Sequence, residues 1–185
     1  LLPGDGFLIA EPIISRVRSI SRDDGAGAIV RAAGRQDSGA ATFSGDGGPA
    51  VKAQLNQPHS IQFDRAGHLF ICDIRNHVIR RVDASTCVIS TFAGTGKPGP
   101  TPDRSPIKGT PLNGPRSLDF DYNGDVWLAT REGNQVFRFD LKTGLIHHVA
   151  GTGKKGFTGN GGPAKIATLS GPKGVAIAPS GNVCL

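Results

Sequence analysis

Three basic residues, His59, Arg116 and Lys173, each follow a proline at intervals of 57 residues. Cationic side chains attract anions, and their potentials reinforce one another when a fold brings them to one concave mouth. The alternative is that each is separately solvated and holds no ligand. We expect a ring of basic residues that attracts an anion, provided that positions 57 apart meet in space.

Two polar residues, Gln62 and Asp119, lie three positions beyond two of these basic residues and are candidates for the same ligand site. The third copy has Ala176 at this position. Carboxylate, amide and imidazole groups that point inward from several strands could hold a divalent metal. The same mixture of polar and small residues also suits a water-filled channel, and the sequence leaves both interpretations open.

A second group, Asp73, Asn76 and His77, falls in one turn between two expected strands. These side chains could form a site. However, Asp and Asn often bond the backbone amides of their own turn. We therefore predict a structural role, in which Asp73 and Asn76 satisfy turn amides and His77 packs beside them.

Other motifs that suggest chemistry are better explained as structure. Gly94–Gly99 and Gly151–Gly156 match a dinucleotide-binding glycine pattern, but neither opens a long helix. Gly45–Gly48 lacks the further carboxylates of a calcium loop. The adjacent His147 and His148 would point to opposite faces of a strand and cannot chelate one ion together. The visible sequence therefore predicts no catalytic residue and no metal site.

The element that must position the candidate residues is a repeat of 57 residues. Four columns share this period: Leu55, Leu112 and Leu169; Pro58, Pro115 and Pro172; Gly67, Gly124 and Gly181; Pro49, Pro106 and Pro163. Each unit contains four short β-branched and aromatic runs, separated by turn residues. The expected strands are 7–11, 16–20, 28–34, 60–63, 69–72, 78–82, 88–93, 117–120, 126–129, 135–139, 145–150, 174–177 and 183–185, and residues 49–55 suggest one helical turn that begins at Pro49.

Tandem units of four antiparallel strands predict an all-β fold, the β-propeller. Each small sheet would bury its faces only against its neighbours, and its first strand would be innermost. The channel rim would then hold His59, Arg116 and Lys173. We divide the single domain 1–185 into a partial blade 1–34, a linker 35–57, a blade 58–94, a linker 95–114, a blade 115–151, a linker 152–171 and a partial blade 172–185.

The segment from Asp73 to Val82 resembles the NHL signature, in which Asp and two spacers precede Asn-His and an Ile-Arg pair. The glycine-rich stretches 93–96, 150–153, 45–50 and 159–164 resemble the linkers of the long-period bacterial and extracellular NHL type. The next blade departs from the signature, with Thr130 in place of Asp and Gly133-Asn134 in place of Asn-His. The resemblance implies a six-bladed ring closed by further blades of a longer chain, and an extracytoplasmic location.

The amino-acid composition says more about the fold than about the function. Gly 27, Pro 13 and 6% aromatic residues suit many short strands and tight turns. No apolar run approaches the roughly 20 residues that span a bilayer. The net charge of +6 is compatible with an anionic ligand, a nucleic acid or a membrane surface.

Three functions remain in contest. The first, which we favour, is a non-enzymatic scaffold that binds a protein, a glycan or a small anionic ligand on one face. The second is a metal-dependent lyase or lactonase with calcium or zinc in the channel, since Pro58-His59-Ser60 resembles a zinc-binding position of peptide-amidating lyase propellers. The third is RNA binding, for which Tyr122 and Trp127 are the only Tyr and Trp available as stacking platforms.

Overall fold

The computed structural model describes residues 7–20, 29–35 and 44–185, and these residues form antiparallel sheets. The first sheet has three strands, β1 (Phe7–Glu11), β2 (Arg16–Ile20) and β3 (Ile29–Ala33). The second has four, β4 (Pro58–Phe63), β5 (Leu69–Asp73), β6 (Val78–Val82) and β7 (Ile89–Gly94). The third comprises β9 (Pro115–Phe120), β10 (Val126–Thr130), β11 (Gln135–Asp140), β12 (Leu145–Ala150) and the short β8 (Ser105–Pro106). The last is a hairpin of β13 (Ala176–Ile177) and β14 (Val183–Cys184).

The all-β prediction is confirmed, and each expected strand has a counterpart within two residues at either end among the described residues. Of the expected strand 28–34, Ala28 lies outside the described residues. The predicted helical turn is the 3-10 helix η1 (Ala50–Lys52), which follows Pro49. Two similar helices are η2 (Ile74–Asn76) and η3 (Ala164–Ile166). In the described part of the chain, no helix is long and apolar enough to cross a membrane.

Neighbouring sheets cover both faces of the second sheet at its middle strands, β5 and β6. Strand β5 is buried along its whole length. Leu69 and Ile71 pack in a cluster with residues of β2, β3 and the linker around η1. Phe70 and Cys72, which alternate with them, pack instead against the third sheet. A sheet with apolar residues on both faces must be covered on both sides, which explains the radial order of the sheets.

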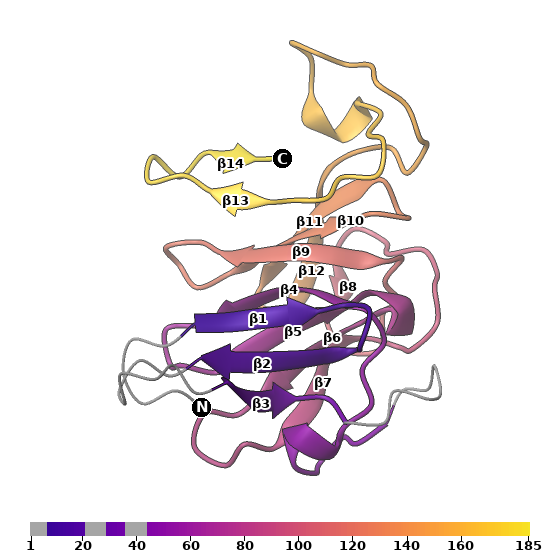
Figure 1. Cartoon of the computed structure of the whole chain (residues 1–185). Helices are drawn as coiled ribbons and strands as arrows, with labels where there is room; N and C mark the ends of the chain where they lie inside the picture. Colours follow the sequence, from indigo (N-terminus) through magenta and orange to yellow (C-terminus); the bar gives the residue numbers. More distant parts are fainter. Residues whose placement is uncertain (1–6, 21–28, 36–43) are drawn as a thin grey trace.

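The first strands of successive units lie side by side. Figure 1 shows β1, β4, β9 and β13 following one another along one side of the molecule, and β4 and β13 each contact β9. The Ser60 hydroxyl accepts a hydrogen bond from the Leu118 amide at 3.3 Å, and the Ser117 hydroxyl accepts one from the Val175 amide at 3.2 Å. These bonds join the inner strands of successive sheets around a common axis, as the propeller arrangement requires.

The segments between the blades also add structure at the outer edges. Strand β8 pairs with β12, and Pro49 forms an equivalent single bridge with Val88. The sequence placed these residues in linkers and gave no sign of the pairing. Covering the outermost strand protects an edge that could otherwise pair with another chain.

Candidate anion-binding rim

Two of the basic residues that follow the repeated prolines, His59 and Arg116, lie on β-bulges. In the second sheet Pro58 pairs with Asp73 and Ser60 with Cys72, so His59 is the extra residue of β4. In the third sheet Pro115 pairs with Thr130 and Ser117 with Ala129, so Arg116 is the extra residue of β9. A bulge re-aims the inserted side chain and ends regular pairing. The fold therefore gives His59 and Arg116 equivalent places at the start of two inner strands.

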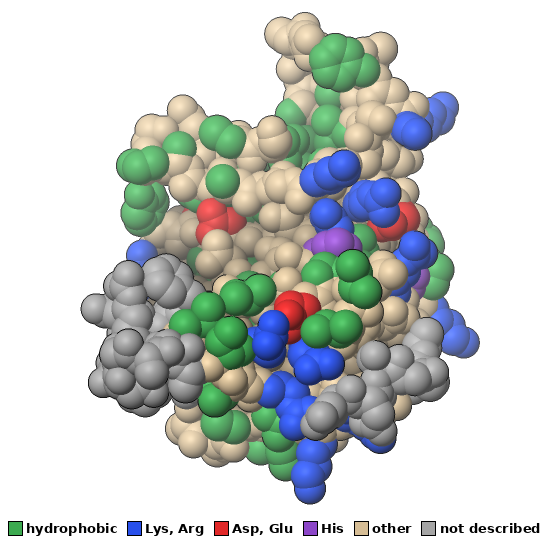
Figure 2. Space-filling view, in the orientation of Figure 1, with side chains coloured by type: hydrophobic (Ala, Val, Ile, Leu, Met, Phe, Trp, Pro, Cys, Tyr) green, Lys and Arg blue, Asp and Glu red, His purple; other side chains and the backbone are tan. Residues whose placement is uncertain are grey.

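The turns between second and third strands bring more charge to the same end of the sheets. Burial lowers the pKa of His59, and the positive charges of Arg116, Arg131 and Arg75 lower it further. Burial also lowers the pKa of Arg116, and the charge of Arg131 adds to this effect. We call His59, Arg75, Arg116, Arg131 and Lys173 the basic rim. In Figure 2 basic side chains and a histidine gather on the right of the view.

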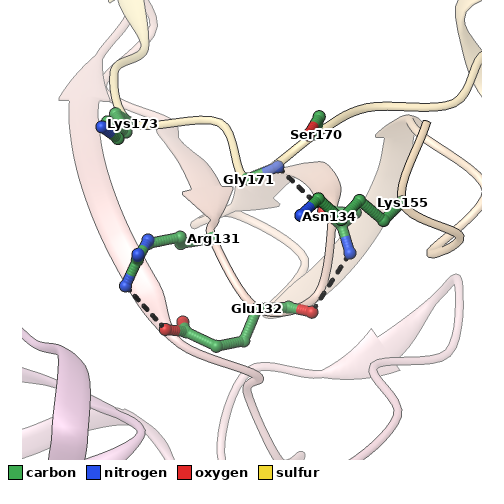
Figure 3. A pocket seen from close by; sticks show the side chains of 7 residues that line it. All are labelled: Arg131, Glu132, Asn134, Lys155, Ser170, Gly171 and Lys173. Carbon is green, nitrogen blue, oxygen red and sulfur yellow. Dashed lines mark hydrogen bonds and ion pairs between the residues drawn. The ribbon is translucent and has the colours of Figure 1, made fainter. Parts of the chain in front are cut away.

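A depression of about 410 Å³ lies on this rim, between the third sheet and the segment that leads to β13. We call it the rim pocket, and it is lined by Arg131, Glu132, Asn134, Lys155, Ser170, Gly171 and Lys173. Figure 3 shows Arg131 and Lys173 on one side of it and Asn134 and Lys155 on the other. Arg131 Nη1 lies 3.3 Å from Glu132 Oε1. The pocket therefore presents several cations and amide or hydroxyl groups around a single carboxylate.

Sequence reasoning found Lys173 but missed the other charged residues of this pocket. Arg131 and Glu132 lie in the β10–β11 turn, which an antiparallel sheet places at the same end as the start of β9. That rule was a usable signal for them, and it also applies to Arg75. Lys155 lies in a linker whose path the repeat pattern did not predict.

The turn residues Asp73, Asn76 and His77 bond differently from the expected local pattern. Asp73 accepts the amide of Asn56 at 2.6 Å, outside its own turn, and Asn76 donates its side-chain amide to Asp73 at 2.8 Å. His77 Nδ1 accepts the amide of Gly114, at the start of the next blade, at 3.2 Å. The turn is closed by η2, whose cap amide at His77 bonds the Ile74 carbonyl, so the Asp73 carboxylate is available to the incoming linker.

The contact of His77 recurs in each unit with a different residue type. Asn134 Oδ1 accepts the amide of Gly171 at 2.9 Å, and Ser15 Oγ accepts the amide of Gln57 at 3.3 Å. Ser15, His77 and Asn134 all have left-handed backbones, with φ of 51°, 53° and 50°. We call these three contacts the blade clasps. Serine, histidine and asparagine thus supply the acceptor in three successive units, which accounts for Asn134 in the place of the signature histidine.

Gln62 and Asp119 lie together but away from the basic rim. Gln62 donates to Asp119 Oδ1 at 3.2 Å, and Asp119 Oδ2 accepts the amide of Ile177 in β13 at 2.9 Å. Both residues belong to the last part of an inner strand, whereas the basic rim lies where these strands begin. Their part in a ligand site stays a prediction, and Asp119 also ties one blade to the next.

The described surroundings of His59 do not fit a zinc site. No three His, Cys, Asp or Glu side chains gather closely enough to hold a metal ion among the described residues. The charges that act on His59 are those of Arg116, Arg131 and Arg75 and the single carboxylate of Glu132, so the positive charges are in excess and would repel a divalent cation.

Known proteins with similar sequences and structures agree with this geometry. A human protein, NHL repeat-containing protein 2, is 28% identical over 146 residues, which is 78% of this chain. The chain carries NHL repeats of a β-propeller. This chain spans 20% of the length of the human protein. No family model matches the sequence.

Two solved structures share the fold of this NHL chain. Virginiamycin B lyase from Staphylococcus aureus has a TM-score of 0.59 at 12% identity, over 99% of this chain and 46% of the lyase. An auxiliary nutrient binding protein from Bacteroides ovatus has a TM-score of 0.60 at 17% identity, over 92% of this chain and 40% of that protein. At these identities the likeness concerns the fold alone.

Proposed function

We propose that this NHL propeller is a non-enzymatic scaffold that binds a small anionic ligand on its basic rim. The observation that carries the proposal is the convergence of His59, Arg75, Arg116, Arg131 and Lys173 at one end of the inner strands. Lys173, Arg75 and Arg131 are exposed, and His59 and Arg116 are partly exposed, so an anion can reach them. Charges of one sign in a concave site raise the local concentration of a ligand of opposite sign.

The Bacteroides nutrient-binding protein, which has a similar fold, supports a binding role. Because virginiamycin B lyase also has a similar fold, enzymatic activity should be tested as well. A nutrient-binding role would place the protein outside the cytoplasm, and this location is part of the proposal. We do not extend the proposal to RNA, which would need aromatic rings beside the basic rim. The indole N–H of Trp127 donates a hydrogen bond to Asp121 at 2.9 Å, and Tyr122 lies in the turn after β9, at the end of that strand away from the rim.

The test is charge reversal on the rim of the full-length protein. Arg116→Glu with Lys173→Glu should weaken binding of citrate and of inorganic phosphate by at least about tenfold, because two attractive charges become repulsive. Isothermal titration calorimetry at low and high salt measures both affinities. Wild-type affinity should fall as salt rises, since exposed charges are screened.

A matched control separates the rim from net charge. Lys52→Glu with Lys142→Glu makes the same change in total charge at exposed positions in η1 and in the β11–β12 turn. This variant should bind as the wild type does. Equal losses in both variants, or no loss in the rim variant, would refute a binding site on the rim.

A further inference from the structure

Glu132 is the one acidic residue among those that line the rim pocket. Its carboxylate pairs with Arg131 at 3.3 Å, and it lies across the backbone of Gly114, where a Cβ added to that glycine would collide with Glu132 Oε2. Gly114 directly precedes Pro115 and Arg116 at the start of β9. The Glu132 carboxylate thus lies between the β10–β11 turn and the start of β9, the strand that carries Arg116.

The placement of Glu132 affects several basic groups at once. Its negative charge raises the pKa of His59, His77 and Arg116, in opposition to the burial that lowers each of them. These three residues come from three separate segments of the chain. Glu132 therefore lies at a point that an anion bound to the rim would also favour.

The pair that holds Glu132 in place is weak. The Arg131 and Glu132 side chains are 46% and 34% exposed. An ion pair in such contact with water contributes little to stability, because solvent and salt screen it. Arg131 can therefore exchange this carboxylate for another oxyanion at small cost.

We propose that the rim pocket binds one oxyanion group between Arg131, Lys155 and Lys173, and that Glu132 is a built-in competitor which this group displaces from Arg131. The inference rests on the proposed function and specifies its subsite and its regulation. A guanidinium can take two oxygens of a carboxylate or phosphate at once, and two lysines supply point charges beside it. Ser170 adds a hydroxyl that can donate to the bound oxyanion, whereas the Asn134 amide holds the turn through its bonds to Gly171, Glu132 and Gly153.

The experiment is removal of the competing charge in the full-length protein. Glu132→Gln keeps the shape of the side chain, and it should tighten binding of both citrate and inorganic phosphate by about 3- to 10-fold, since Arg131 no longer has to give up a carboxylate partner before it takes the anion. Arg131→Gln should weaken binding, and adding Glu132→Gln to it should restore much less affinity than Glu132→Gln gains alone. Calorimetric titration of the four proteins completes the double-mutant cycle.

The control is Asp140→Asn, which removes one negative charge at the other end of the same sheet. Asp140 accepts the amides of Lys142 and Thr143 at 2.9 Å, and an asparagine oxygen can retain these turn bonds. Its affinity for both probes should equal that of the wild type. If the wild type binds and Glu132→Gln binds no more tightly, the competitor role is wrong and the basic rim stands. If the wild type binds neither probe at low salt, both proposals fall.

Discussion

At the scale of single residues, the signature histidine acts as a hydrogen-bond acceptor between blades. His77 Nδ1 receives the amide of the buried Gly114, and Asn134 does the same for Gly171 in the next unit. His77→Asn should therefore leave the free energy of unfolding within about 0.5 kcal/mol of the wild type, whereas His77→Ala should cost about 2 kcal/mol. The alanine loses the acceptor and strains a left-handed backbone. Urea denaturation of the full-length protein measures both, and equal costs would contradict the acceptor role.

The same clasp predicts that stability depends on pH, because His77 Nδ1 can accept the Gly114 amide only while it carries no proton. Burial lowers the pKa of His77 below its usual 6.5. As pH falls below 6.5, the unfolded chain binds the proton first, so the clasp's stabilisation declines until the lowered native pKa is reached and then stays constant. Burial raises the pKa of Asp73 to about 6, which has the opposite effect: below that pH the native state binds the proton first.

Comparison with His77→Asn isolates the histidine contribution, since Asp73 is present in both proteins. The unfolding free energy of the wild type minus that of the variant should decrease as the pH is lowered from about 7 to below 6.5, the usual histidine value. The measurement is a series of denaturant titrations across this range. A difference that is constant with pH would show that the ring nitrogen does not serve as the acceptor.

At the scale of elements, a linker loop is tied to a blade by a buried charge. Arg80 of β6 is fully buried, and its guanidinium contacts Asp46 Oδ1 at 2.6 Å and the carbonyls of Ser44 and Gln54 at 3.4 and 3.5 Å. In the next unit Phe137 takes the place of Arg80, and Asp103, the counterpart of Asp46, accepts the amide of His148 instead. Between these two units the strand residue and the bond made by the linker carboxylate thus differ together.

This exchange predicts which substitutions the second blade tolerates. Asp46→Ala removes the carboxylate partner of a buried charge and should cost about 2 to 3 kcal/mol, whereas Arg80→Met, an apolar replacement as in the next blade, should cost less. Differential scanning calorimetry of the full-length protein gives both values as shifts in Tm. A lower Tm for Arg80→Met than for Asp46→Ala would contradict this account of the linker.

The strands and the repeat could be predicted from the sequence, because the alternation of apolar and polar residues and the turn residues are local features that recur in each tandem unit. The bulges at His59 and Arg116 were not, since a bulge depends on pairing with β5 and β10. The role of Asp46 was missed for the same reason: Arg80 lies 34 residues further along the chain. Residues that act across blades were thus found only where their column was repeated, as for Lys173.

At the scale of the whole molecule, successive sheets are joined by a few recurring bonds from a side chain of one sheet to the backbone of the next. The blade clasps act at one end of the inner strands, and Ser60, Ser117 and Asp119 act along them. Because these contacts reach only to the neighbouring sheet, stability should be a sum of sheet and interface contributions, as in other repeat proteins. A weakened interface should then release the adjoining hairpin without unfolding the rest.

Asp119 tests this expectation, because its Oδ2 accepts the Ile177 amide across the interface. Asp119→Ala should speed hydrogen exchange at Ile177 by about tenfold, while exchange at Ile71 and Arg80, one sheet away, stays unchanged. Gln62→Ala is the matched control, since it removes the side-chain bond that reaches Asp119 from the second sheet and leaves the Ile177 bond intact. Faster exchange at all three amides would mean that the sheets open together, and the nearest-neighbour description would then be wrong.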